Sequence, residues 1–114
     1  MFGGIGGLGQ LAGLLGKLPK IQEEAEKLRE RIDRLTAEGH AGGGMVTVKV
    51  TGRMTVTSCR ISTEALADRE MLEDLVAAAT TQALDRVKDQ ISEETRRMAT
   101  EVGLPPGVNL PGLM

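Results

Sequence analysis

Basic side chains recur along one side of a helical stretch near the N-terminus. Lys20, Lys27 and Arg34 are seven residues apart, and Arg31 lies one turn from Lys27. Residues at this spacing return to nearly the same side of an α-helix. Lys and Arg gathered on one surface can neutralise phosphates and release their counterions. The pattern makes Lys20, Lys27, Arg31 and Arg34 the candidate phosphate-binding residues, and a two-fold dimer would present them twice.

A second interpretation of these bases stays open, because Glu residues are interspersed with them and could pair with them on a solvated helix. Other basic residues are weaker candidates. Some lie among acidic residues near the C-terminal end, and the rest decorate two expected strands: Arg86, Lys88, Arg96, Arg97, Lys49, Arg53 and Arg60. With a single aromatic residue, Phe2, the chain has little to stack on unpaired bases, which argues against a single-strand binder.

Residues for catalysis or metal binding do not cluster in the sequence. The one histidine, His40, and the one cysteine, Cys59, have no second ligand near them. The glycine-rich GGIGGLGQL lacks the preceding strand and the GK[ST] of a phosphate-cradling loop. We therefore expect no enzymatic activity, no cofactor, no metal and no small-molecule substrate.

The helix that carries the four bases has an unbroken heptad seam, which needs a partner helix. Its members are Leu14, Leu18, Ile21, Ala25, Leu28, Ile32 and Leu35. Pro19 is expected to start the firm helix, because it restricts its neighbour and cannot donate a backbone hydrogen bond. The helix then runs to Glu38 and ends at Gly39. Residues 1–10 are too rich in glycine to hold a helix unaided and are expected to be flexible.

A switch to period two predicts strands after the helix. Val46, Val48 and Val50 alternate with polar residues, which is typical of a strand with one buried face. Gly52-Arg53 makes a reversal, and a second strand runs from about Met54 to Ile61 with a bulge near Ser58. A further short strand at residues 36–41 is only weakly signalled.

The last helix is expected to begin at the cap Asp68, to run for about 33 residues and to stop at Gly103. Residues 103–114, rich in Pro and Gly, are expected to form a flexible tail. The fold class is therefore α+β, with two long helices flanking a small antiparallel sheet in the order α-β-β(-β)-α. At 114 residues the chain is one domain, residues 1–114.

Composition favours an oligomer in a reducing compartment. A core without Trp or Tyr is thin, so we expect a homodimer that buries the Val46–Val50 strand face together with apolar helix positions. Residues 1–60 hold nine Lys/Arg against six Asp/Glu, whereas residues 61–114 hold five against ten. A basic partner surface therefore belongs to the first half. The absence of a signal-peptide pattern and of a membrane span predicts a cytoplasmic location without membrane association.

Four segments occur in one order along the chain: MFGGIGGLGQL, AGGGMVTVKVTG, EDLVAAATTQAL and GLPPGVNLPGLM. Together they resemble the YbaB/EbfC family of bacterial nucleoid-associated proteins over nearly the whole chain. The resemblance implies an intertwined homodimer in which the sheets join and helix pairs project as arms, and it implies DNA binding. The sequence departs from the family pattern at Pro19, which bears on the reach of the first arm. It also departs at Ser62-Thr63, where relatives often carry Asp-Pro, which alters only a turn.

These observations predict a nucleoid-associated protein of the cytoplasm that binds double-stranded DNA as a homodimer through backbone contacts. No helix-turn-helix or zinc-finger pattern is present in the sequence. The alternative is a coiled-coil protein-interaction adaptor or chaperone-like clamp. Adaptable methionines favour this alternative; they are Met45, Met54, Met71, Met98 and Met114.

Overall fold

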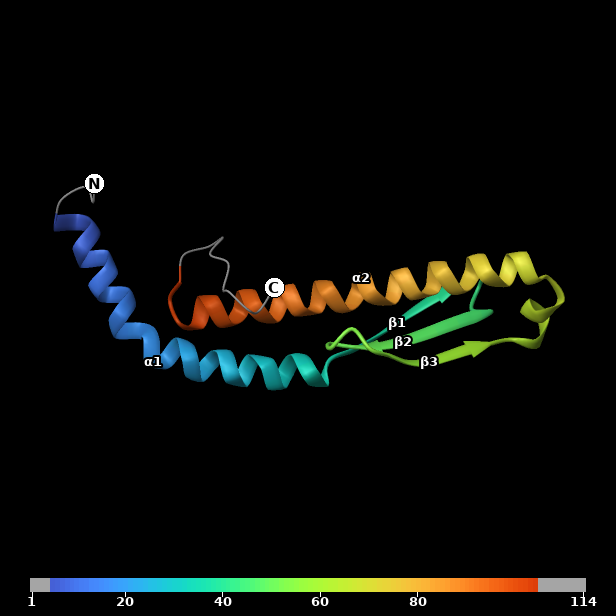
Figure 1. Ribbon diagram of the computed structural model, residues 1–114, viewed down its shortest axis with the longest axis horizontal. Coiled ribbons are helices and arrows are strands. Elements are labelled where there is room, and N and C mark those ends of the chain that lie inside the picture. The colour runs from blue at the N-terminus through green and yellow to red at the C-terminus, as the bar shows by residue number, and fades with distance from the viewer. Residues whose placement is uncertain (1–4, 105–114) are drawn as a thin grey trace. The chain divides into compact units, whose positions relative to one another are not determined.

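The computed structural model describes residues 5–104, except for the side chains of residues 5–8, 10 and 14. The elements follow one another as helix α1, three strands, a short 3-10 helix and helix α2 (Figure 1). Their bounds are α1 Ile5–Arg34, β1 Thr36–Ala41, β2 Val46–Thr51, β3 Val56–Ile61, η1 Thr63–Ala67 and α2 Arg69–Glu101. The chain forms two compact units. Unit 1 combines residues up to Arg29 with those from Thr95 onward, and unit 2 is Glu30–Glu94.

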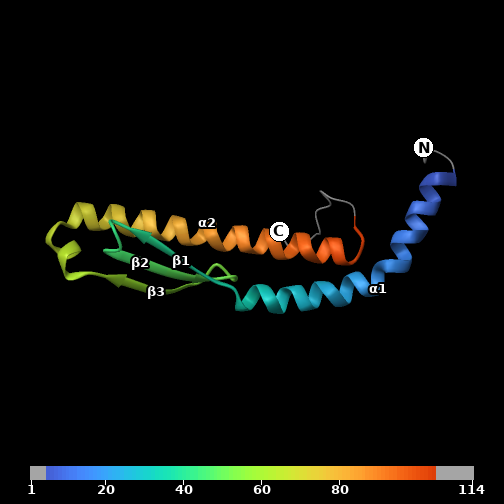
Figure 2. The same cartoon turned by 180° about the vertical axis from the view of Figure 1, so that it is seen from behind.

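Unit 2 is built on an antiparallel sheet in the order β1-β2-β3. The three alternating valines of β2, Val46, Val48 and Val50, are fully or almost fully buried, as the period of two predicts. Helix α2 runs along the β1 side of the sheet in both views (Figures 1 and 2). Its small residues Ala79 and Ala83 join Val87 and the valines in one core cluster.

The end of α1 differs from the prediction that the helix reaches Glu38 and stops at Gly39. The helix ends at Arg34, and Gly39 lies inside β1, which pairs with β2 over its whole length from Thr36↔Thr51 to Ala41↔Val46. The weakly signalled strand is thus a full member of the sheet. A Cβ at Gly39 would collide with the backbone carbonyl of Ala79 in α2. This glycine therefore serves close packing of strand against helix and does not end α1.

The second hairpin confirms the predicted bulge. In the β2–β3 pairing, Lys49 lies opposite Ser58, while the next residue, Val50, lies opposite Val56. Thr57 is the extra residue of the bulge, and its hydroxyl donates to the Lys49 carbonyl at 3.3 Å. The strand is shorter at its start than predicted, because residues 52–55 form the connecting turn.

Helix α2 has the predicted length and cap. It contains 33 residues, and the Asp68 side chain accepts a hydrogen bond from the Met71 amide at 3.0 Å. This N-cap satisfies one of the amide groups that lack a partner in the first helical turn. Gly103 follows the helix with a φ of 76°, a conformation that a glycine adopts without strain.

In unit 1, the start of α1 corrects the expectation that the firm helix begins at Pro19. The helix begins at Ile5 and runs through Pro19, so residues 5–10 are helical in spite of their glycines. Figure 1 shows the helix changing direction along its blue to light-blue part, and an internal proline is the usual cause of such a bend. Residues 1–4 of the expected flexible N-terminus and 105–114 of the expected tail lie outside the described residues.

The heptad seam of α1 is covered unevenly within unit 1. Leu28 is fully buried, and so is Met98 from the last turns of α2, which belong to the same unit. Leu18, in contrast, is 43% exposed, and Leu11 and Leu15 nearby are 50% and 56% exposed. The seam thus loses cover toward its N-terminal part. Neither long helix, over its described residues, has a stretch apolar enough to cross a membrane.

Candidate functional site

The two candidate bases of unit 1 differ in their surroundings. Lys20 is exposed and makes no ion pair with any described residue. The Lys27 ammonium lies 3.3 Å from Glu23 Oε1 and 3.5 Å from Glu24 Oε1. The hydrogen bond to Glu23 and the charge of Glu24 raise the pKa of Lys27, so this side chain stays charged at neutral pH. Lys27 would exchange these contacts for a phosphate, and only the pair with Glu23 has both side chains well exposed and therefore contributes little energy.

The two candidate bases of unit 2 divide in the same way. Arg34 is exposed and has no ion pair among the described residues. Arg31 is partly buried; its Nε atom lies 3.5 Å from Glu94 Oε2 in α2, and this atom makes no hydrogen bond with the described residues. Sequence reasoning missed Glu94, because only the fold brings it to Arg31. The arrangement thus leaves Lys20 and Arg34 free for a ligand and gives Lys27 and Arg31 acidic neighbours.

Another basic surface lies on the face of the sheet that the core does not use. Cross-strand register places His40, Thr47 and Arg60 in one row. A second row is formed by Glu38, Lys49 and Ser58. These six residues line a shallow depression of about 450 Å³, which we call the polar sheet face. The alternation Thr47-Val48-Lys49 signalled this face in the sequence, although Lys49 and Arg60 ranked there as weaker candidates.

The side chains of the polar sheet face interact at its β1 side. His40 Nδ1 lies 3.0 Å from Thr47 Oγ1, and His40 Nε2 lies 3.7 Å from Glu38 Oε2. Lys49 and Arg60 are exposed and make no ion pair with any described residue. The only carboxylate among the six residues therefore faces the histidine, and both strong bases remain available.

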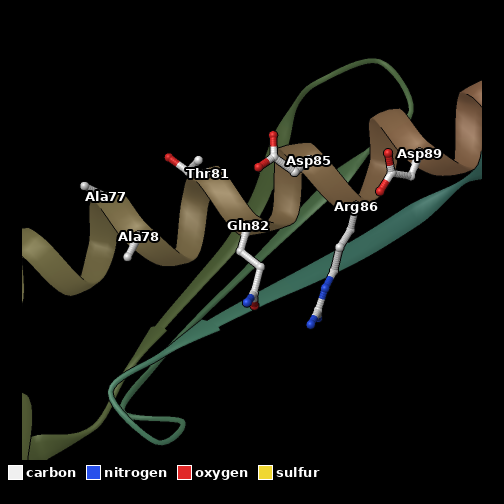
Figure 3. A pocket seen from close by; sticks show the side chains of 7 residues that line it. All are labelled: Ala77, Ala78, Thr81, Gln82, Asp85, Arg86 and Asp89. Atoms are coloured by element: carbon white, nitrogen blue, oxygen red, sulfur yellow. The ribbon is translucent and has the colours of Figure 1, made fainter.

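The outer edge of β1 is closed by side chains from α2. The His40 amide donates to Gln82 Oε1 at 2.7 Å, and Arg86 Nη1 donates to the Glu38 carbonyl at 2.8 Å. Figure 3 shows Gln82 and Arg86 reaching from α2 toward the strand. The same flank holds an open hollow of about 580 Å³. Since Asp85 and Asp89 also line it, this hollow does not suit a polyanion.

The outer edge of β3 has a different character. No strand of the described residues pairs with it. Val56, Cys59 and Ile61 lie opposite the buried valines of β2 and therefore on the core side of the sheet. All three are nevertheless exposed, with Val56 at 50% and Ile61 at 41%, because α2 covers the β1 side. These three residues form what we call the β3 apolar strip.

One ion pair fixes the turn between β2 and β3. Arg53 Nη2 donates to Asp33 Oδ2 at 3.0 Å, and this hydrogen bond lowers the pKa of the Asp33 carboxyl. Arg53 is therefore held by the end of α1, in contrast to Lys49 and Arg60. Among residues 5–104, no group of three or more His, Cys, Asp or Glu residues is placed to hold a metal ion.

Comparison with known proteins gives a consistent result. Residues 7–102 match the YbaB/EbfC DNA-binding family. A nucleoid-associated protein of Xanthomonas campestris pv. campestris strain B100 is 38% identical over 90 residues, which cover 79% of this chain and 85% of the relative. A nucleoid-associated protein of Xylella fastidiosa strain 9a5c is also 38% identical, with coverage of 79% and 84%.

The fold has a solved counterpart as well. The crystal structure of an uncharacterized protein from Helicobacter pylori matches with a TM-score of 0.64 and 24% identity. The match covers 79% of this chain and 94% of that one, and it supports the helix, three-stranded sheet and helix arrangement. Since the family match spans most of the described residues, the chain belongs to the YbaB/EbfC DNA-binding family.

Proposed function

We propose that this protein is a nucleoid-associated homodimer that binds double-stranded DNA through the phosphate backbone. The observation that carries the proposal is the membership of a DNA-binding family, joined to exposed bases on α1 that have no acidic partner among the described residues, Lys20 and Arg34. Backbone binding needs cations at a surface and no base-reading motif. The relatives named nucleoid-associated proteins support a location on the chromosome in the cytoplasm.

The DNA surface proposed for α1 consists of Lys20, Lys27, Arg31 and Arg34. Lys20 and Arg34 need no rearrangement to reach phosphate. Lys27 and Arg31 would exchange a carboxylate for a phosphate, and for Lys27 the exchange costs little at the exposed Glu23 and more at the largely buried Glu24. We expect Lys20 and Arg34 to contribute more than the other two.

Fluorescence anisotropy with labelled duplexes of two unrelated sequences tests this proposal. The wild-type affinity should fall steeply between about 50 and 200 mM salt. The variant Lys20→Gln/Arg34→Gln should bind both sequences more weakly, with a log-log salt slope shallower by about 0.9 for each phosphate that is no longer neutralised. The variant Lys27→Gln/Arg31→Gln should show a smaller change in both quantities.

The matched control is Arg69→Gln/Lys88→Gln, which removes the same formal charge from α2. Arg69 already pairs with Glu73 at 3.0 Å, and both control residues are exposed. Circular dichroism should show that all three variants keep the helical content of the wild type. Failure of the wild type to bind either duplex at the lower salt would refute DNA binding. An effect of the control as large as that of the α1 variants would refute the surface.

The homodimer is proposed to form through β3. A sheet edge without a partner strand offers unpaired backbone groups, and the β3 apolar strip adds exposed apolar surface beside it. The edge of β1 is less suited to this role, because Gln82 and Arg86 occupy two of its backbone groups, the His40 amide and the Glu38 carbonyl. Pairing of two β3 strands would also satisfy two-fold symmetry, since each copy presents the same surface.

This assignment replaces the sequence-based expectation that the Val46–Val50 face lies in the interface. The three valines of that face are covered by α2 of their own chain and have no surface left for a second copy. Exposed apolar residues of the neighbouring strand take their place in the proposal. The alternation of β2 alone does not reveal that α2 packs on the valines.

Cys59 provides a test of the β3 interface without any substitution. It is exposed at the centre of the β3 apolar strip, so two antiparallel β3 strands would bring two copies of Cys59 close together. Sedimentation should give a dimer at micromolar concentration, and a short bis-maleimide should cross-link it efficiently. The variant Cys59→Ser should remain dimeric without cross-linking. A folded monomer would contradict the dimer, and a dimer that resists cross-linking would contradict the β3 interface.

The adaptor alternative has one observation in its favour. Leu11, Leu15 and Leu18 recur at helical spacing on α1 and are all about half exposed. Such a ridge could accept an amphipathic helix of a partner protein. Replacement of Leu11 and Leu15 by Gln discriminates between the functions. If the protein acts on DNA alone, the variant should bind duplex DNA as tightly as the wild type does. If the wild type shows no DNA binding, the adaptor interpretation takes over.

A further inference from the structure

We propose that the polar sheet face is a second contact surface for the phosphate backbone of double-stranded DNA, separate from the bases of α1. This inference rests on the proposed DNA-binding function and adds a site within unit 2. The bases that would carry it are Lys49 and Arg60, from neighbouring strands of the sheet. Thr47, Ser58 and His40 of the same face would orient the backbone through their hydroxyl and imidazole groups.

The register fixes the spacing of the two bases. Thr47 lies opposite Arg60, and Lys49 lies opposite Ser58, so Lys49 and Arg60 are diagonal neighbours on one side of the sheet. Their Cα atoms are therefore separated by about 7–8 Å, a distance that long side chains can easily shorten or extend. Thr47 lies beside Arg60 in one row, and Ser58 lies beside Lys49 in the other. Both hydroxyl groups can donate hydrogen bonds to phosphate oxygens.

Charge complementarity favours a polyanion as the occupant. Lys49 and Arg60 make no ion pair with any described residue, whereas Arg53 nearby is neutralised by Asp33. The one carboxylate of the face, Glu38, lies 3.7 Å from the imidazole of His40, on the strand farthest from Arg60. Two unpaired cations over a shallow, hydroxyl-rich depression suit a chain of phosphates, which needs no deep pocket.

The position of Arg60 would bring the two polar sheet faces together in the proposed dimer. Arg60 lies on β3, the strand proposed to pair with its copy. Pairing there would join the two polar sheet faces into one surface, with both Arg60 side chains near the two-fold axis and both Lys49 side chains farther out. Four unpaired cations would then act on one DNA segment, and their contributions to salt dependence should add.

The experiment measures duplex affinity of the full chain as a function of salt. The variant Lys49→Gln/Arg60→Gln should weaken binding to unrelated sequences. Its log-log slope should be shallower by about 0.9 for each phosphate left without its cation, which is about 1.8 for the pair in each chain and about 3.6 for both pairs of the proposed dimer. The control Arg69→Gln/Lys88→Gln removes the same charge from α2 and should keep the wild-type slope. Both pairs are exposed, so circular dichroism should be unchanged.

A substitution that is expected to raise DNA affinity makes the test independent of general damage to the protein. Glu38→Gln removes the carboxylate of the polar sheet face and should strengthen binding. The substitution leaves the backbone carbonyl of residue 38 that accepts from Arg86. A defect in folding could weaken DNA binding but would not strengthen it. Tighter binding of this variant, together with weaker binding of Lys49→Gln/Arg60→Gln, supports the site.

The outcomes separate this inference from the proposed function. If the wild type binds duplex DNA and the Lys49/Arg60 variant retains the wild-type slope and affinity, the polar sheet face does not touch DNA although the protein binds DNA. The same conclusion follows if Glu38→Gln binds no more tightly than the wild type. If the wild type itself does not bind duplex DNA at low salt, the proposed function and this inference both fail.

Discussion

The two edges of the sheet are built from similar strands and yet meet their surroundings in opposite ways. Strand β1 lies beside α2, contains Gly39 for close packing, and has two of its backbone groups bonded by Gln82 and Arg86. Strand β3 has no partner beyond β2 among the described residues, and its core-side residues Val56 and Ile61 are exposed. An exposed edge is a template for pairing. The comparison indicates that one helix restricts self-association to a single edge, which favours a closed dimer over an open chain.

The largest effect on stability is expected at Gly39, where β1 packs closely against α2. Gly39→Ala would place a Cβ against the backbone of Ala79, and a backbone atom cannot move away as a flexible side chain can. We expect a decrease of about 3 kcal/mol in the free energy of unfolding, because strand and helix must separate. Urea denaturation measures this decrease.

The control for Gly39→Ala is Gly13→Ala in α1. The added Cβ at residue 13 meets nothing within 4 Å, and alanine is the better helix former. This variant should be equally stable or more stable by about 1 kcal/mol. A Gly39→Ala protein as stable as the wild type would show that α2 does not hold β1 as closely as the structure indicates.

The next effect concerns the open edge. Val56→Lys/Ile61→Lys places charges on the β3 apolar strip and should weaken the proposed dimer by a factor of about 100 or more, equivalent to about 2.7 kcal/mol. Sedimentation over a range of concentrations measures the dissociation constant. Thr55→Lys/Thr63→Lys adds the same charge at exposed polar residues just outside β3 and serves as the control. Equal weakening by both variants would point to general repulsion and away from the strip.

A smaller effect is expected at the closed edge. Gln82→Ala/Arg86→Ala removes the hydrogen bonds at 2.7 Å and 2.8 Å and leaves two backbone groups of β1 without these partners. Water can reach these exposed groups, so stability should fall by about 1–2 kcal/mol. Assemblies larger than a dimer should appear in light scattering as the concentration rises. A variant that stays strictly dimeric would show that the two side chains do not control self-association.

The smallest effect is expected at the ion pair of the β2–β3 turn. Arg53→Gln should raise the pKa of Asp33 toward its ordinary value of 3.8, because the hydrogen bond that lowers it is removed. A lowered pKa stabilises the fold above the unfolded-state pKa, and the contribution disappears as pH falls through the folded-state pKa. Stability at neutral pH should hardly change, since both side chains are largely exposed. An NMR titration of the Asp33 carboxyl measures the shift, and an unchanged pKa would contradict the pairing.

Sequence reasoning was accurate where local signals decide the structure. The alternation of β2, the bulge near Ser58 and the cap Asp68 were all predicted, because each depends on neighbours within a few residues. It was wrong at Gly39, whose role depends on Ala79, forty residues away in the chain. It was also wrong about the start of α1, where helix continues from Ile5 through Pro19.

The candidate site shows the same division between local and distant information. The periodicity of α1 identified Lys20 and Arg34, which are exposed and unpaired among the described residues. The contact of Arg31 with Glu94 requires knowledge of how residues distant in the sequence are brought together. The polar sheet face also required the register of three strands, because no single strand places Lys49 beside Arg60. The assignment of these residues to DNA contact stays a prediction.

The single extra residue Thr57 has a consequence for how this gene can change. Because of the bulge, Val56 lies on the same side of the sheet as Cys59 and Ile61, although the interval from 56 to 59 is odd. Deletion of the Thr57 codon would remove the bulge and leave Val56 on the side of Cys59, because these residues would then be two apart. Deletion of the Arg60 codon, in contrast, would place Ile61 on the side opposite Cys59 and should be rejected. An inserted glycine should be accepted at Gly43 and Gly44, where the positive φ angles favour glycine and nothing lies within 4 Å.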